Sequence, residues 1–218
     1  MRKVVLCLIV LMVFIQSEAI AKQSINEIPM YGENHKPKIK YNVKLSQSAT
    51  KLGWKYYYQG DLNTAMKRFN QGWALNPENP EVYWGFGLIM GQRAYTEKTE
   101  KNLMESIRFL NIAVKKKFND GRILGDLAFS HTIIGYYFKF EKKDTKKAKE
   151  HFESARQLFP KAFRLNSKYP PIVANWSIFY FYTEDYKKAK DKASEAVKMG
   201  YKFNPDYINN LKSEHKLN

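Results

Sequence analysis

The residues of this chain best suited to chemistry are its four histidines, because a neutral imidazole binds metal ions and moves protons near neutral pH. They are His35, His131, His151 and His215. No two of them are three or four residues apart, so no single helix presents two imidazoles on one face. We therefore expect no metal site, and we interpret His131 as an ordinary packed residue or one that lines a groove.

Sequence motifs typical of catalysis or nucleotide binding are absent from the chain. It contains no G-x-S-x-G, no P-loop and no G-x-G-x-x-G. The run Trp84-Gly85-Phe86-Gly87 is rich in glycine, but it lies inside a predicted helix, where Gly87 lets a partner helix approach closely. Carboxylates mostly have lysines nearby, as Glu150 has Lys146, which is typical of a solvated helix surface and not of an acid–base pair. We therefore expect a protein that is not an enzyme and uses no cofactor.

The first 21 residues have the pattern of a secretory signal peptide. Two basic residues precede the apolar run Val4–Ile15, and Ala19-Ile20-Ala21 follows it as an A-x-A cleavage site. A membrane anchor is the alternative, but a spanning helix needs about 20 apolar residues and this run has 12. Cleavage also removes Cys7, the only cysteine, so the mature chain has no thiolate ligand and no disulfide. We expect an exported protein, periplasmic or secreted, with residues 1–21 cleaved.

The chain is strongly basic, with 37 lysines and arginines against 21 acidic residues and a net charge of +16. Loss of residues 1–21 lowers the charge only to +15, since two basic residues and one acidic residue leave. Such a charge favours anionic surfaces and acidic partners. The basic residues are densest at 36–40, 115–117 and 142–149, although solvated helix faces explain these runs as well. No nucleic-acid-binding motif is present, so we expect no nucleic acid partner.

Helical periodicity in the sequence begins near Leu45 and recurs as four helix pairs. Residues 22–44 are polar and contain two prolines, so we expect a flexible arm or an extended segment lying on the first pair. Residues 45–218 are expected to form the repeat domain, with Tyr95–Lys101 as a long polar connection and a short C-terminal helix, Asn204–Leu211, as a cap. Apolar spacing predicts the paired helices Leu45–Gln59, Leu62–Leu75, Pro80–Arg93, Leu103–Lys117, Ile123–Phe140, Lys146–Phe159, Pro170–Tyr182 and Tyr186–Met199.

A trio of residues recurs in the second helix of each predicted pair, at offsets of zero, four and seven. The trios are Ala65, Phe69 and Gly72; Ser106, Leu110 and Ala113; Ala148, Phe152 and Ala155; and Ala189, Ala193 and Ala196. They start 41, 42 and 41 residues apart. Small residues at the ends of a trio allow close helix approach, so we expect the pairs to stack as an all-α solenoid.

The recurring unit resembles the tetratricopeptide repeat (TPR). The first unit carries the family's pattern at Leu52, Gly53, Tyr56, Gly60-Asp61, Ala65, Phe69, Leu75 and Pro77. The fourth unit is similar at Glu184-Asp185-Tyr186, and the second at Trp84, Phe86 and Gly87, while the third is the weakest. The spacing exceeds the family's period of about 34 residues. The resemblance implies a right-handed α-solenoid of about four antiparallel helix pairs, with a concave groove, lined by the first helices, that binds peptides or protein segments.

The resemblance also implies which residues line the groove. Neighbouring helix positions are about 100° apart, so Trp54, Tyr57 and Tyr58 cannot all point inward with Gly53 and Tyr56. By the family's geometry the groove residues are the aromatic Trp54, Tyr57, Tyr58, Trp84, Tyr136, Phe140, Phe181 and Tyr182, beside the polar Gln47, Glu81 and Gln92. Aromatic anchors beside polar groups suit a protein-binding site. The alternative is that these rings pack the core or a neighbouring repeat.

The sequence therefore predicts a non-catalytic scaffold or adaptor of the cell envelope that binds a protein or peptide segment. Apolar side chains of the partner would be buried against the groove aromatics, and the lysines would steer an acidic partner. The alternative is a basic surface that binds anionic envelope lipid or polysaccharide, with peripheral contact to the membrane and strong sensitivity to salt.

Overall fold

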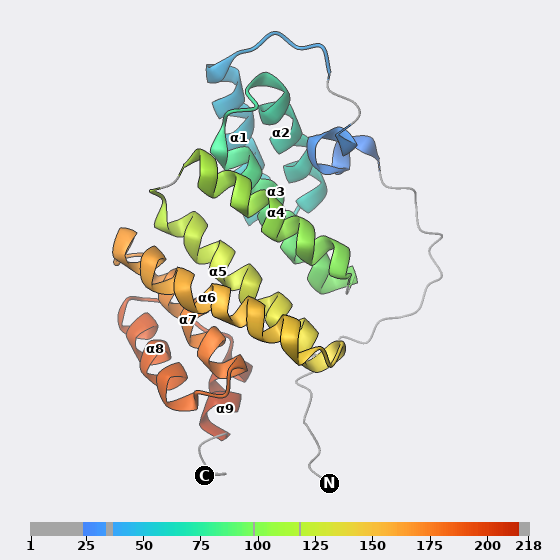
Figure 1. Cartoon of the computed structure of the whole chain (residues 1–218). Helices are drawn as coiled ribbons and strands as arrows, with labels where there is room; N and C mark the ends of the chain where they lie inside the picture. The colour runs from blue at the N-terminus through green and yellow to red at the C-terminus, as the bar shows by residue number, and fades with distance from the viewer. Residues whose placement is uncertain (1–23, 34–36, 98, 118, 214–218) are drawn as a thin grey trace.

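The computed structural model describes residues 24–33, 37–97, 99–117 and 119–213. The predicted signal peptide lies outside these ranges, as do His35 and His215. Within them the chain is helical, without strands, and the four predicted pairs are present (Figure 1). The helices are α1 (Val43–Tyr58), α2 (Leu62–Leu75), α3 (Pro80–Glu97), α4 (Glu100–Lys116), α5 (Gly121–Tyr136), α6 (Thr145–Leu165), α7 (Pro170–Tyr182), α8 (Tyr186–Lys198) and α9 (Pro205–Ser213).

Most of these helices begin where a short polar side chain can accept a hydrogen bond from the first turn. Asn42 accepts from the amide of Leu45 at 2.9 Å before α1, and Asp61 accepts from that of Thr64 at 2.9 Å before α2. Asp120, Asp144 and Asp185 cap α5, α6 and α8 in the same way. Such caps satisfy amides that lack a partner within the helix, so these boundaries are set by local sequence.

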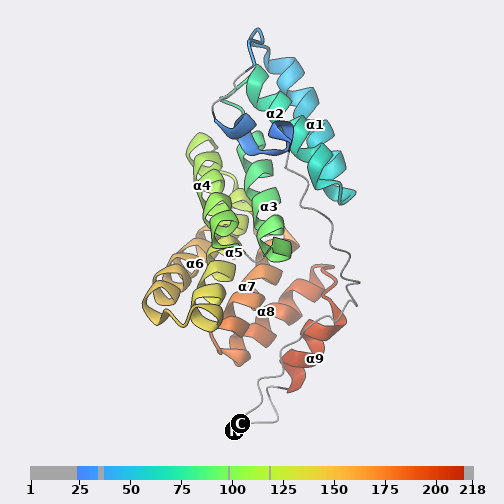
Figure 2. The same ribbon diagram turned by 90° about the vertical axis from the view of Figure 1, so that its right-hand side faces the viewer.

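The pairs follow one another along the molecule, from α1–α2 at one end to α7–α8 at the other, where α9 lies beside α8 (Figure 2). Every member of the four trios is buried, as the spacing predicted. Leu211 of α9 packs on Ala189 and Ala193 of α8, so α9 covers the end of the stack. The chain is an α-solenoid with a capping helix.

Glycines in the first helices of the first three pairs make room for the large residue at the centre of each of their trios. A Cβ on Gly53 would lie 2.8 Å from the ring of Phe69, and one on Gly87 would lie 2.6 Å from Leu110. A Cβ on Gly135 would lie 2.8 Å from the ring of Phe152. These distances are closer than carbon atoms can approach, so only glycine lets each of these three pairs close around its central side chain.

The structure differs from the predicted boundaries in the second and third pairs. The stretch 95–101, expected as a long connection, is mostly helix, because α3 continues to Glu97 and α4 begins at Glu100. Burial of Ala94 and a hydrogen bond from Asn102 to Glu97 (2.8 Å) hold the end of α3 against the beginning of α4. In the third pair α5 gives way to a π-helical turn, η3 (Tyr137–Glu141), and α6 continues past Phe159 to Leu165. Longer helices therefore account for the long repeat.

The described part of the N-terminal arm packs against the first pair. Residues 24–33 form two 3₁₀ turns, η1 (Ile25–Glu27) and η2 (Pro29–Gly32), which lie on α2. Asn70 of α2 donates to the carbonyls of Asn26 (2.9 Å) and Ile28 (2.8 Å), and Tyr31 is buried with its ring centroid 6.4 Å from that of Trp73. A side chain from the second pair, Arg93, donates to the carbonyl of Glu27 at 2.7 Å. This segment thus bridges the first two pairs.

Among the described residues, no helix combines the length and the apolar character needed to span a membrane.

The glycine packing makes a prediction for Gly85 of α3. Its Cβ would lie 2.4 Å from the fully buried ring of Phe69, so we expect Gly85→Ala to lower the free energy of unfolding by about 1–3 kcal/mol. Gly91→Ala in the same helix is the matched control, because its Cβ would meet only the Ser106 side chain, whose hydroxyl is the nearest group at 3.2 Å. Urea unfolding measures both variants, and equal effects would contradict the packing argument.

Candidate partner-binding surface

The residues predicted to line a groove fall into two aromatic clusters on the first helices of the pairs. The tryptophan cluster consists of Trp54, Tyr57 and Tyr58 from α1 and Trp84 from α3. The tyrosine cluster consists of Tyr136, Phe140, Phe181 and Tyr182 from α5, η3 and α7. Gln47 and Gln92 are exposed and belong to neither cluster.

The tryptophan cluster centres on Trp54. Its ring centroid lies 4.7 Å from that of Trp84 in an edge-on arrangement, 5.9 Å from that of Tyr57 and 6.1 Å from that of Tyr58, on which it stacks. Edge-on and stacked aromatic pairs at these distances are favourable beyond the area that they bury. The cluster therefore ties α1 to α3 and holds the ring of Tyr58, which is 75% exposed, on its surface.

Two indole N–H groups of this cluster each donate to a carboxylate of the next pair. The Nε1 of Trp54 donates to Oε2 of Glu81 at 3.1 Å, and the Nε1 of Trp84 donates to Oδ2 of Asp126 at 2.7 Å. A buried indole needs an acceptor, and a carboxylate is the strongest one among the protein side chains. The two bonds link α1 to α3 and α3 to α5 along one side of the solenoid.

Asp126 was not among the predicted site residues, yet it is the most perturbed acid of the surface. Burial raises its pKa to about 7, although the hydrogen bond from Trp84 opposes the shift. Asp120, six residues earlier, behaves differently. Burial alone would raise its pKa, but hydrogen bonds from Arg122 and Lys117 outweigh that effect and hold the pKa at about 2. The sequence carried no signal for Asp126 beyond an acidic residue amid apolar ones.

Two tyrosines from distant parts of the chain lie within electrostatic reach of Asp126. Burial, and then the negative charge of Asp126, raises the pKa of Tyr57 to about 12. The same two causes, together with Tyr58, raise the pKa of Tyr169, which precedes α7. The end of α1, the beginning of α5 and the beginning of α7 therefore meet around this carboxylate, although more than 100 residues separate Tyr57 from Tyr169.

The tyrosine cluster joins the last two pairs. Tyr136 lies with its ring centroid 4.6 Å from that of Tyr182 and 4.8 Å from that of Phe140. Phe181 faces the other way, with its ring 5.6 Å from that of Tyr207 in α9. Burial raises the pKa of Tyr182 to about 12.

The predicted groove residues differ in how much of each side chain is exposed to a partner. Tyr58, Gln47 and Gln92 are exposed, while Trp54, Tyr57, Glu81 and the tyrosine cluster are half-buried. Trp84 is only 6% exposed and belongs to the core, so the expectation that its ring is free for a partner is wrong. It lies between Trp54 and the Arg122 guanidinium, whose central carbon is 5.0 Å from the ring centroid. Trp84 supports the surface from beneath.

His131 and His151 pair across the third helix pair, a contact that same-helix spacing did not reveal. Their Nδ1 atoms are 3.0 Å apart, and Phe138 stacks on His151 with ring centroids 5.7 Å apart. Burial, reinforced by His151, lowers the pKa of His131 to about 4, and burial also lowers the pKa of His151. No group of three or more potential metal ligands occurs in the described part of the chain. His131 is thus a packed residue with one imidazole partner.

The histidine pair predicts a pH dependence of stability. The folded protein favours neutral His131, with a pKa of about 4 against 6.5 in the unfolded chain. Its contribution to stability is therefore complete above pH 6.5 and is lost as the pH falls toward 4. Over that interval, we expect the wild type to lose about 3 kcal/mol more than His131→Asn in urea unfolding. Gln157→Ala, on the exposed side of α6, should keep the wild-type profile; parallel curves for wild type and His131→Asn would contradict the prediction.

Comparisons with known proteins show what the chain resembles in sequence and in fold. The family described as TPR repeat matches residues 53–92, from α1 into α3. A thermophilic TPR protein of Thermus thermophilus is 16% identical, with 71% of this chain and 74% of that chain covered and a TM-score of 0.60. PilF of Pseudomonas aeruginosa is 13% identical over 73% of this chain and 78% of its own, with a TM-score of 0.36. No curated protein sequence matches.

The predicted resemblance is confirmed by this match together with the helical stack described above. The Thermus protein shares the fold over most of the chain, while the sequence pattern is recognised in the first repeat and a half. The chain has the fold of a TPR protein and carries a TPR repeat sequence at residues 53–92.

Proposed function

We propose that this chain is a non-catalytic scaffold that holds a segment of another protein against the tryptophan cluster. Proteins of this family generally bind protein partners through their stacked helices. The observation that carries the proposal is Tyr58, an exposed aromatic ring held in place by Trp54. An aromatic side chain that is already ordered loses little entropy when a partner covers it, which is the property of binding hot spots.

The proposed site extends along the first helices. Half-buried Trp54 and Tyr57 lie beside Tyr58, and the tyrosine cluster on α5 and α7 would extend the site. Glu81 and the exposed glutamines would supply polar contacts at its rim. We place the scaffold in the cell envelope or outside the cell, on the strength of the signal-peptide pattern of residues 1–21.

A pair of tyrosine variants tests the scaffold. We expect peptides selected from a random display library to bind Tyr58→Ala about tenfold more weakly than wild type, measured by fluorescence anisotropy, because the variant loses an anchor worth more than 1 kcal/mol. Tyr41→Ala is the matched control, since Tyr41 is 60% exposed but lies before α1. A library that yields no binding peptide, or equal losses in both variants, would count against the scaffold.

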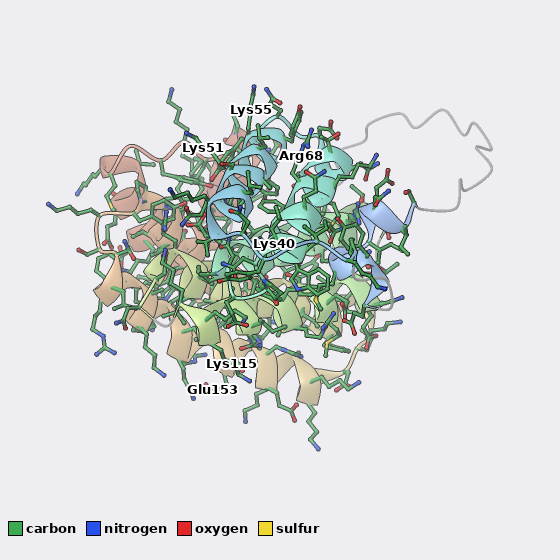
Figure 3. All side chains as sticks on the ribbon, turned by 90° about the horizontal axis from the view of Figure 1, so that it is seen from above. Lys40, Lys51, Lys55, Arg68, Lys115 and Glu153 are labelled. Atoms are coloured by element: carbon green, nitrogen blue, oxygen red, sulfur yellow. The ribbon has the colours of Figure 1, made fainter. Side chains whose placement is uncertain are left out.

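A second candidate function rests on the outer face of α1 and the segment before it. Apolar side chains are exposed here beside lysines: Tyr41, Val43, Leu45 and Leu52 with Lys40, Lys44, Lys51 and Lys55. Leu45 and Leu52 are seven residues apart, so they share one face of the helix. Lys51 and Lys55 extend outward from α1, at the opposite edge of the view from Lys115 (Figure 3). An apolar row flanked by lysines suits an anionic lipid surface.

Matched charge reversals test this second function. We expect wild type to bind phosphatidylglycerol vesicles in a sedimentation assay, and Lys51→Glu to bind at least about fivefold more weakly, since each lysine near an anionic surface contributes about 1 kcal/mol. Lys115→Glu makes the same change in charge away from α1 and should bind like wild type. Equal losses would mean that net charge, and not this face, governs binding.

A further inference from the structure

We propose that Asp126 selects a cationic side chain of the partner, a lysine or an arginine, and binds it beside Tyr57, Tyr58 and Tyr169. This inference rests on the proposed scaffold function, because it assigns the chemistry of the partner at the same surface. It reverses the expectation from composition, in which the basic chain attracts an acidic partner.

Asp126 has hydrogen-bond acceptor positions that no described residue uses. Its Oδ2 accepts from Trp84 at 2.7 Å, and no hydrogen bond or ion pair joins its Oδ1 to any described residue. A carboxylate offers about four acceptor positions, so most of its capacity is unused. The other two acids nearby are occupied by partners within the protein.

Those partners hold Asp120 and Glu81 in place. Arg122 donates to both oxygens of Asp120, at 3.0 and 2.7 Å, and Lys117 adds an ion pair at 3.1 Å. Glu81 accepts from Trp54 at 3.1 Å and lies 4.0 Å from Lys117. Both cations of this neighbourhood are therefore committed to acids other than Asp126.

The charges around Asp126 leave room for one more cation. Three carboxylates (Asp126, Asp120 and Glu81) face two cations, Lys117 and Arg122, so ionised Asp126 leaves one negative charge in excess. This local excess lies within a chain of net charge +16. An acidic side chain brought here would meet a like charge in a poorly hydrated setting, which is unfavourable. The nearby titratable tyrosines, Tyr57 and Tyr169, are neutral at pH 7, as tyrosines ordinarily are, and burial and Asp126 raise their pKa further.

The aromatic surroundings favour a cation for a second reason. Tyrosine rings attract a cation placed over their faces. The protein already uses this contact at Trp84, where the Arg122 guanidinium carbon lies 5.0 Å from the ring centroid. A partner lysine with its ammonium group at Asp126 would have the rings of Tyr57 and Tyr169 nearby to contact its methylene stem.

Binding of a cation at Asp126 should be coupled to release of a proton. The pKa of Asp126 is about 7 in the free protein because its burial disfavours the charged form. A bound cation favours the charged form, so binding at neutral pH should release a proton. Affinity for a cationic peptide should accordingly fall as the pH drops below 7 and Asp126 becomes protonated.

The test uses a positional peptide array in which one position of each library-selected peptide is varied among Lys, Arg, Gln and Glu. We expect wild type to prefer Lys or Arg over Gln by about tenfold, the value of one charge-assisted hydrogen bond. Asp126→Asn, which keeps an oxygen to accept from Trp84, should still bind but lose this preference. Glu153→Gln is the control for charge, since Glu153 is exposed on α6 and should leave the preference intact.

The outcomes separate this inference from the scaffold on which it rests. Peptides that bind with no preference for Lys or Arg, or with a preference for Glu, would overturn the role of Asp126 and leave the scaffold standing. An array that binds no peptide would overturn both. The wild-type preference decides the matter even if a variant fails to fold, and calorimetry in buffers of different ionisation enthalpy should detect proton release only with Asp126 present.

Discussion

The fold depends on a contact that recurs in the first three pairs, between a glycine in the first helix and the large side chain at the centre of the trio in the second. Gly53 receives Phe69, Gly87 receives Leu110 and Gly135 receives Phe152. Each contact brings two helices closer than any other residue would allow, and the small ends of the trio let the pair close along its length. Phe69 is held on two sides, because Gly85 of α3 also faces its ring. The same ring therefore closes the first pair and docks the second pair upon it.

Polar links then join one pair to the next. The indoles of Trp54 and Trp84 donate hydrogen bonds to Glu81 and Asp126 of the next pair. The Asn79 amide donates to the hydroxyls of Ser46 and Thr50 in α1, at 3.0 and 3.1 Å. These groups are buried or half-buried, so leaving one without its partner would cost about 1–3 kcal/mol. They fix how far each pair rotates on its neighbour, which apolar packing alone does not specify. Two of these hydrogen bonds, those of Trp54 and Trp84, belong to the tryptophan cluster of the candidate site.

The net charge of the whole molecule and the local charge around Asp126 have opposite signs. Over its whole surface the chain is basic, and the outer face of α1 is both basic and apolar. Around Asp126 the balance is reversed, because the cations there are already paired with Asp120 and Glu81. Long-range attraction follows net charge, whereas the contacts made after docking follow the local arrangement. A basic protein can thus be drawn to an acidic surface and still accept a basic side chain at one position.

The sequence by itself determined the helices, their pairing and the trios, because these depend on capping residues and on apolar spacing within about 20 residues. It also identified the TPR pattern and the aromatic residues of the two clusters. The tertiary structure decided which of those rings are exposed: Trp84 belongs to the core, and Tyr58 lies on the surface. It also brought together His131 with His151, and Asp126 with Tyr57 and Tyr169. His131 and His151 lie on the two helices of one pair, so the packing within that pair sets their distance. Asp126, Tyr57 and Tyr169 come from different parts of the stack, so their arrangement depends on the rotation of one pair on the next, which no local pattern encodes.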